Sequence, residues 1–129
     1  LNTDGELTWQ KSFGGSNNDR ANTVLDLGNS GYIVVGNTNS DDGHVSNHRG
    51  QEDALILKID NQGHHIWSKT LGGSGNDHIN HAINTLDGDL ILVGSSNSSD
   101  VDLSTNQGMT DAWVIKLDDQ GNTLWSRNM

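Results

Sequence analysis

The sequence predicts an all-β fold of short strands joined by polar turns, and three observations support this class. Apolar residues come in bursts of about four, rich in Ile, Val, Leu and Trp, and separated by Gly, Asn, Asp and Ser. No segment carries a sustained apolar period of about 3.6 residues, which would indicate an amphipathic helix. The chain also repeats itself, because residues 7–64 align with residues 65–122 without a gap and 22 of the 58 aligned positions are identical.

Each repeat unit reads as four strands, of which the first two form a hairpin. The first strand is expected at residues 21–27 and 79–85, where apolar residues alternate as in a half-buried strand. The second is expected at residues 32–36 and 90–94, which read YIVVG and LILVG. Because these runs are apolar throughout, we expect both of their faces to be buried.

The third and fourth strands form a second hairpin in each unit. The third is expected at residues 53–60 and 111–118, which read DALILKID and DAWVIKLD. A short turn ending in Gly then leads to the fourth strand, at residues 65–71 in the middle of the chain. Residues 7–13 and 123–129 match this fourth strand, so we expect one copy at each end of the chain.

Tandem four-stranded units of this length are typical of β-propellers. We therefore expect propeller-type antiparallel blades: residues 1–13 as the end of a preceding blade, residues 14–71 as one blade and residues 72–129 as another. A propeller needs typically about 4–8 blades to close, so two blades leave two broad sheet faces uncovered. The ring is expected to be completed by several copies of the chain, as a homo-oligomer, or by further blades of a longer chain.

Composition excludes several classes of protein. The 129 residues carry a net charge of −10, and such an acidic chain would be repelled by the phosphates of a nucleic acid. The chain has no Cys, which excludes a disulfide framework and a thiolate–zinc site. Its longest apolar runs are far below the roughly 20 residues of a transmembrane helix, so no membrane span is expected. The first residues lack the basic and apolar stretches of a signal peptide.

Three motifs recur in order along the whole chain: W-x-K-x-x-G-G-S-x-N-D, then I-x-V-G-x-x-N-S-x-D, then D-A-x-x-x-K-x-D-x-Q-G. Together they resemble the bacterial β-propeller repeats of the SBBP type, and residues 42–50 look like the loop that follows the second strand in that family. The second unit departs from the pattern there, with Val101 and Asp102 in place of Gly43 and His44. The resemblance implies a non-catalytic part of a larger protein in the extracellular space or on the cell surface, as in Bacteroidetes.

We therefore expect a non-catalytic repeat scaffold or binding module, with a surface protein as partner, and not an enzyme. The chain has no G-x-S-x-G elbow, and its two Glu, Glu6 and Glu52, lie in no apolar setting that would raise their pKa. The alternative is a multivalent, lectin-like propeller that binds glycans. The two alternatives differ in the role of a Trp that occurs once per unit, at Trp9, Trp67 and Trp125. In a scaffold this Trp packs between blades, and in a lectin it offers an exposed platform to a sugar. Trp113, at the position of a Leu in the first unit, is expected in the core.

Two loops hold the remaining candidate ligands. His44 and His48 lie with Asp41, Asp42 and Glu52 in the loop before the third strand, and they form either a ligand or metal set or a solvated polar loop.

The matching loop of the second unit carries Asp100 and Asp102, which are candidates for calcium. An ordinary polar loop is the alternative there as well, and we assign no metal or cofactor. In the Gly-Gly-Ser loops, Asp19 and Asp77 are expected to accept hydrogen bonds from backbone amides.

Overall fold

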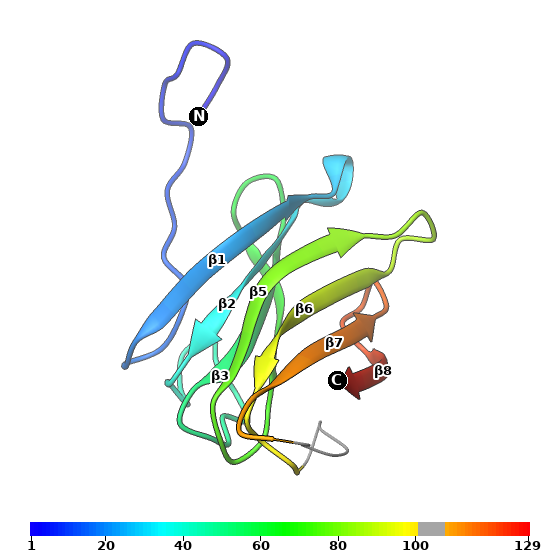
Figure 1. Ribbon diagram of the computed structural model, residues 1–129. Helices are drawn as coiled ribbons and strands as arrows, with labels where there is room; N and C mark the ends of the chain where they lie inside the picture. Colours follow the sequence, from blue (N-terminus) through cyan, green and yellow to red (C-terminus); the bar gives the residue numbers. More distant parts are fainter. Residues whose placement is uncertain (101–107) are drawn as a thin grey trace.

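The computed structural model describes residues 1–100 and 108–129, and in them it confirms the all-β prediction with two four-stranded antiparallel sheets (Figure 1). Sheet 1 has the strand order β1 (Asp19–Asp26), β2 (Tyr32–Thr38), β3 (Asp53–Ile59) and β4 (His65–Leu71). Sheet 2 has the order β5 (Asp77–Asn84), β6 (Leu90–Ser96), β7 (Asp111–Leu117) and β8 (Thr123–Asn128). The only helical element in the described ranges is one 3-10 turn, η1 (Gly28–Ser30), between β1 and β2.

The two sheets repeat each other down to their irregularities. The pairing of β1 with β2 shifts register between Ala21 and Thr23, and the pairing of β5 with β6 shifts between Ile79 and His81. These positions lie 58 residues apart. The third and fourth strands of each sheet also shift register at matching positions. The internal repeat of the sequence is therefore a repeat of structure, and we call residues 58 positions apart counterparts.

Residues 7–13 differ from the expectation, because they form no strand although the structure describes them in full. Figure 1 shows this N-terminal segment as an extended trace outside sheet 1. A strand needs a free sheet edge, and the edge of β3 that a fourth strand would use already carries β4. The copy at the other end of the chain does form a strand, because β8 finds the edge of β7 free.

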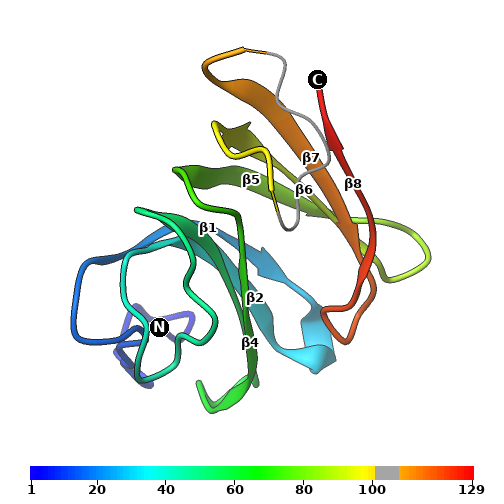
Figure 2. The ribbon, with the colours of Figure 1, turned by 90° about the horizontal axis from the view of Figure 1, so that it is seen from below.

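The main core lies where the two sheets pack face to face (Figure 2). Sheet 1 contributes alternate residues of its two central strands: Ile33, Val35, Ala54 and Ile56. Sheet 2 contributes residues of its first three strands: Ile79, Ala82, Leu90, Leu92, Trp113, Ile115 and Leu117. Trp113 is fully buried, as the sequence predicts, and its indole N–H donates to Ser126 Oγ at 2.8 Å.

Two Asn side chains of sheet 1 cap the backbone of sheet 2 within this interface. Asn22 Nδ2 donates to the carbonyl oxygen of Ile79 at 2.7 Å, and the N–H of Ile79 donates to Asn37 Oδ1 at 3.1 Å. Ile79 lies at the start of the register shift in β5, and its own side chain is fully buried. The two Asn side chains thus satisfy buried backbone groups that would otherwise cost free energy.

Candidate functional site

An apolar groove of about 400 Å³ lies on the face of sheet 1 that is turned away from sheet 2. Its floor is formed by residues of the first three strands: Ala21, Val24, Tyr32, Val34, Leu55, Leu57 and Ile59. The N-terminal segment forms one wall with Trp9, Lys11 and Phe13. Phe13 and the loop residue Val45 pack on Leu55 and Leu57, so this face is covered in part by the chain itself.

The floor of this groove matches the surface that sheet 2 presents to sheet 1. Seven of its residues have as counterparts the seven sheet 2 residues of the main core. The exposure differs most at β1: Val24 is 60% exposed, whereas its counterpart Ala82 is 1% exposed. Leu55 and Leu57 are buried like their counterparts, because Phe13 and Val45 cover them. The floor of the groove therefore has the residue pattern of the internal sheet interface.

The far face of sheet 2, which is turned away from sheet 1, has the residue pattern of the face that sheet 1 buries against sheet 2. Its apolar residues Ile91, Val93, Ala112 and Val114 are the counterparts of the four residues that β2 and β3 of sheet 1 bury in the main core. Val93 is 39% exposed, whereas its counterpart Val35 is 0% exposed. The molecule thus carries two open faces, and each has the pattern of one side of the internal interface.

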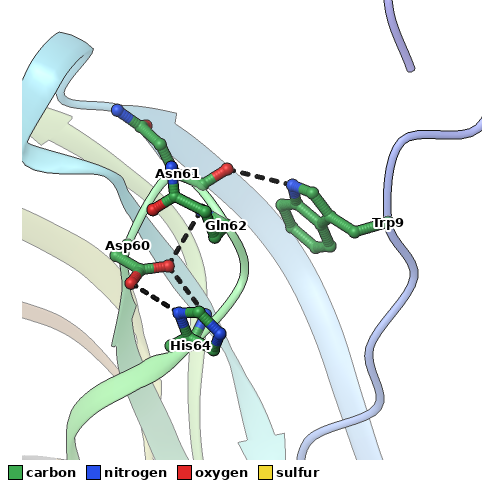
Figure 3. Close-up of polar contacts among 5 residues, drawn as sticks. All are labelled: Trp9, Asp60, Asn61, Gln62 and His64. Carbon is green, nitrogen blue, oxygen red and sulfur yellow. Dashed lines mark hydrogen bonds and ion pairs between the residues drawn. The ribbon is translucent and has the colours of Figure 1, made fainter.

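Two of the three repeated Trp residues lie against a turn between the third and fourth strands of a sheet. Trp9 donates its indole N–H to the carbonyl oxygen of Asn61 at 3.0 Å, and its side chain points from the N-terminal trace toward that turn (Figure 3). A Cβ atom on Gly63 would lie 2.8 Å from Cε3 of Trp9. Trp67 takes the same position on the turn of sheet 2, where a Cβ atom on Gly121 would lie 3.0 Å from its ring.

Trp125 has no such partner in the part of the chain that the structure describes, and it is 40% exposed. The structure therefore assigns the three Trp residues to two situations. Trp9 and Trp67 pack against a turn, and Trp125 is 40% exposed on β8.

The turns that receive Trp9 and Trp67 are held by an Asp at their start. Asp60 Oδ1 accepts the N–H groups of Gln62 and His64 at 2.9 and 2.8 Å, and Asp60 Oδ2 lies 2.8 Å from His64 Nδ1 (Figure 3). The hydrogen bond from the His64 backbone is the main cause that lowers the pKa of Asp60. Asp118 repeats this arrangement, and the hydrogen bond from the Asn122 side chain is the main cause that lowers its pKa.

The two candidate His residues contact different parts of the molecule. His44 Nδ1 lies 3.3 Å from the N–H nitrogen of Gly14, and its ring meets Phe13 edge to face at a centroid distance of 5.3 Å. Its ring also lies 5.1 Å from the ring of His65, and burial together with the charge of His44 lowers the pKa of His65. His48 instead lies beside Asp53.

The sequence leaves the loop that carries His44 and His48 open to two interpretations, a ligand or metal set and a solvated polar loop. Within residues 1–100 and 108–129, no group of three or more His, Asp or Glu side chains is placed to hold a metal ion. The loop instead contacts its neighbours in the chain, since the carbonyl oxygen of His44 accepts Ser68 Oγ at 2.6 Å.

Of the two calcium candidates, Asp102 lies outside the described residues. Asp100 accepts the N–H of Ser74 with Oδ1 at 2.9 Å, and its counterpart Asp42 accepts the N–H of Ser16 at 2.6 Å. A contact that recurs in both units is a loop contact that each unit needs. The structure therefore gives Asp100 a role in holding the Gly-Gly-Ser loop.

Asp19 and Asp77 hold the same loops, as the sequence predicts. Gly15 donates its N–H to Asp19 Oδ2 at 2.8 Å, and Gly73 donates to Asp77 Oδ2 at the same distance. Hydroxyl groups at the end of the second strand complete both sites; for example, Ser40 Oγ donates to Asp19 Oδ2 at 3.0 Å. Each Gly-Gly-Ser loop therefore binds a carboxylate of its own unit.

Asp53 is a buried acidic residue that the sequence reasoning missed. Its Oδ2 accepts the N–H of Arg49 at 2.7 Å, and no part of its side chain reaches solvent. Burial is the main cause that raises its pKa, and the charge of Asp77 raises it further. The sequence does contain a signal for this buried carboxyl group: both Asp53 and its counterpart Asp111 come directly before the apolar residues of a third strand.

A second, polar groove of about 400 Å³ lies where β4 meets the turn of sheet 2. Trp67 lines it together with polar side chains from three segments: Asn47, Arg49, Lys69, Gln120 and Asn122. An aromatic ring beside several hydrogen-bonding groups is an arrangement suited to a sugar.

Comparisons with known proteins assign no family, because no family model matches the chain and no curated protein matches its sequence. Among the described residues, no helix is both long and apolar enough to cross a membrane.

Proposed function

We propose that the chain is a non-catalytic β-propeller-type repeat module, in which each sheet is one blade and serves as a scaffold or binding module. One observation carries this proposal. Residues such as Val35 and Ala82 are buried where the other sheet covers them, whereas their counterparts Val93 and Val24 are exposed where no sheet does. A repeat with two such faces per blade is built to be stacked on both sides.

The apolar lining of the open faces supports this proposal. Burying about 500 Å² of apolar area on one face contributes on the order of 12 kcal/mol before the costs of association. That figure is comparable to the whole stability of a typical domain. Further blades, from other copies or from a longer chain, are the cover that fits such faces.

The polar groups support a structural role. Asp19 and Asp77 hold the loops between blades, and Asp60 and Asp118 hold the turns that receive the Trp rings. Each of these roles recurs in both units, as expected for parts of a scaffold. The proposal places the module in a secreted or cell-surface bacterial protein, and the resemblance to SBBP-type repeats supports that setting.

The second candidate is a multivalent carbohydrate-binding propeller, and the polar groove beside Trp67 favours it. In that case the groove between the two sheets of each chain would hold one sugar. Gln120 lines the groove, whereas its counterpart Gln62 lies on the turn beneath Trp9 and outside the groove. These two Gln residues therefore form a matched pair for a binding test.

A glycan array, followed by calorimetry with simple sugars, decides between the two functions. For the scaffold we expect no specific glycan signal from the wild-type chain. Specific binding that is lost in Gln120→Ala and retained in Gln62→Ala would overturn the scaffold in favour of the lectin.

A further inference from the structure

We propose that the far face of sheet 2 of one copy docks into the groove of sheet 1 of a second copy, where Trp125 replaces Trp9 on the turn at Gly63. This inference deepens the proposed function and rests on it. It commits to a second copy of this chain as the occupant of the groove. The interface between the two sheets within the chain supplies the pattern for the contact.

The apolar residues of the two open faces are counterparts of residues that already pack together inside the chain, so the two faces should be complementary. Within the chain, Val35 and Ile56 of sheet 1 pack with Leu92 and Trp113 of sheet 2 in one core. Shifting every residue to its counterpart gives the contact between copies. Sheet 2 of one copy then supplies Ile91, Val93, Ala112 and Val114, and the groove of the other supplies Ala21, Val34, Leu55 and Leu57.

One of the two polar contacts of the internal interface has a counterpart of the same residue type, whereas the other contact residue, Asn37, has Ser95 as its counterpart. Asn22 caps the carbonyl oxygen of Ile79 within the chain, and its counterpart Asn80 is exposed on sheet 2. The counterpart of Ile79 is Ala21, which is exposed at the groove. In the docked pair, Asn80 of one copy donates to the carbonyl oxygen of Ala21 of the other. Docking therefore satisfies polar groups as well as covering apolar ones.

The N-terminal segment occupies a place that the docking copy needs. Residues 7–13 are the counterpart of β4, yet they form no strand and hold the turn of sheet 1 mainly through Trp9. In a docked pair, β8 of the arriving copy comes to the same place with Trp125. Trp9 already lies against this turn, since a Cβ atom on Gly63 would be 2.8 Å from its ring, so Trp125 can take this position only if Trp9 leaves it. The segment is thus a built-in competitor that docking displaces.

The contact joins two different surfaces, so the interface is heterologous and leads to a closed ring or an open chain of copies. This property gives a sharp test. Val24→Asp places a charge in the groove, and Val93→Asp places one on the far face of sheet 2. Both residues are exposed in the single copy, so both variants should fold. Leu86→Asp, at a fully exposed hairpin position outside both faces, is the control.

Native mass spectrometry and light scattering at micromolar to hundred-micromolar concentration measure the outcome. We expect the wild type and Leu86→Asp to be multiples of 13.9 kDa, and each face variant alone to be a folded monomer. An equal mixture of Val24→Asp and Val93→Asp should give a 1:1 dimer, because each variant keeps the one intact face that the other needs.

Three results would overturn the docking: a monomeric wild type, face variants that associate like the wild type, or a mixture that stays monomeric. Circular dichroism of each variant shows that the fold is kept. These results are distinguishable from a failure of the scaffold function, which the glycan assays report separately.

Discussion

Trp67 of sheet 1 packs its ring against Gly121 of sheet 2, and a Cβ atom on that glycine would lie 3.0 Å from the ring. The backbone of Gly121 has a φ of +86°, in the left-handed region that favours glycine. One residue thus joins the turn of one sheet to the last strand of the other. The contact recurs between Trp9 and Gly63, so it is a property of the repeat.

Replacing Gly121 should cost more stability than its backbone conformation alone explains. Gly121→Ala adds strain at positive φ and a clash with Trp67, and we expect a loss of about 2–4 kcal/mol. Gly88 has the same φ of +86°, but a Cβ atom added there would meet no other atom within 4 Å, so Gly88→Ala measures the strain alone. Urea unfolding at one fixed protein concentration measures both. Equal losses would contradict the packing role of Trp67.

The three repeated Trp residues should differ in their effect on unfolding. Trp67→Ala removes a half-buried ring between the sheets and should cost about 3 kcal/mol, at the low end for a large buried aromatic residue. Trp125→Ala, in a chain kept monomeric by Val24→Asp, should cost less than about 1 kcal/mol because Trp125 is exposed. Thermal and urea unfolding of the two variants give the comparison. A Trp67→Ala variant that keeps its stability but loses sugar binding would support the lectin.

Much of the fold could be predicted from the sequence because the repeat and the apolar pattern are local signals. The fourth strand of the middle unit was predicted with its observed bounds, His65–Leu71, and burial of Trp113 followed from its alignment with Leu55. The first strands begin two residues earlier than predicted, at Asp19 and Asp77, because pairing with the second strand continues beyond the apolar residues.

The remaining features depend on neighbours that a sequence pattern does not reveal. Residues 7–13 have the sequence of a strand but find no free edge, so they stay extended without pairing. Trp9 and Trp125 occupy one repeat position, yet only Trp9 meets a turn. The groove of sheet 1 depends on which residues the rest of the chain leaves uncovered, and no local sequence pattern contains that information.

The buried carboxyl group of Asp53 should make stability depend on pH in a defined direction. Burial raises its pKa in the folded state, so its contribution is fully present below the unfolded pKa and is lost as pH rises through the folded pKa. Asp53→Asn removes the charge and keeps an oxygen for the N–H of Arg49. The unfolding free energy of Asp53→Asn should therefore rise relative to that of the wild type as pH increases above the unfolded pKa of about 3.9.

Asp60→Asn is the control with the opposite sign. The folded pKa of Asp60 is lowered, so its contribution is present above the unfolded pKa and is lost as pH falls through the folded pKa. The unfolding free energy of Asp60→Asn should therefore fall relative to that of the wild type as pH rises. Urea unfolding at several pH values measures both differences, and a pH-independent difference for Asp53→Asn would refute the assignment.

The role of Asp100 should be structural and independent of calcium. Its Oδ1 accepts the N–H of Ser74, so Asp100→Ala should cost about 1 kcal/mol, as should Asp42→Ala at the counterpart position. Millimolar calcium should leave the melting temperature of the wild type unchanged, and a chelator should not lower it. A rise with calcium that disappears in Asp100→Asn would restore the metal site.

Trp9 and Trp125 should act in opposite directions on self-association, although they occupy the same repeat position. Trp9 holds the turn at Gly63 through its ring and its hydrogen bond to Asn61, and a docking copy must displace it before Trp125 can bind there. Trp9→Ala weakens the competitor, so association should tighten by about tenfold, whereas Trp125→Ala removes an aromatic anchor and should weaken it by about tenfold or more. Sedimentation equilibrium over a dilution series gives both constants, and circular dichroism confirms that each variant is folded. If both substitutions weaken association alike, Trp9 belongs to the interface and the N-terminal segment is not a competitor. The sign of the Trp9→Ala effect therefore decides whether the segment blocks the groove or helps to form it.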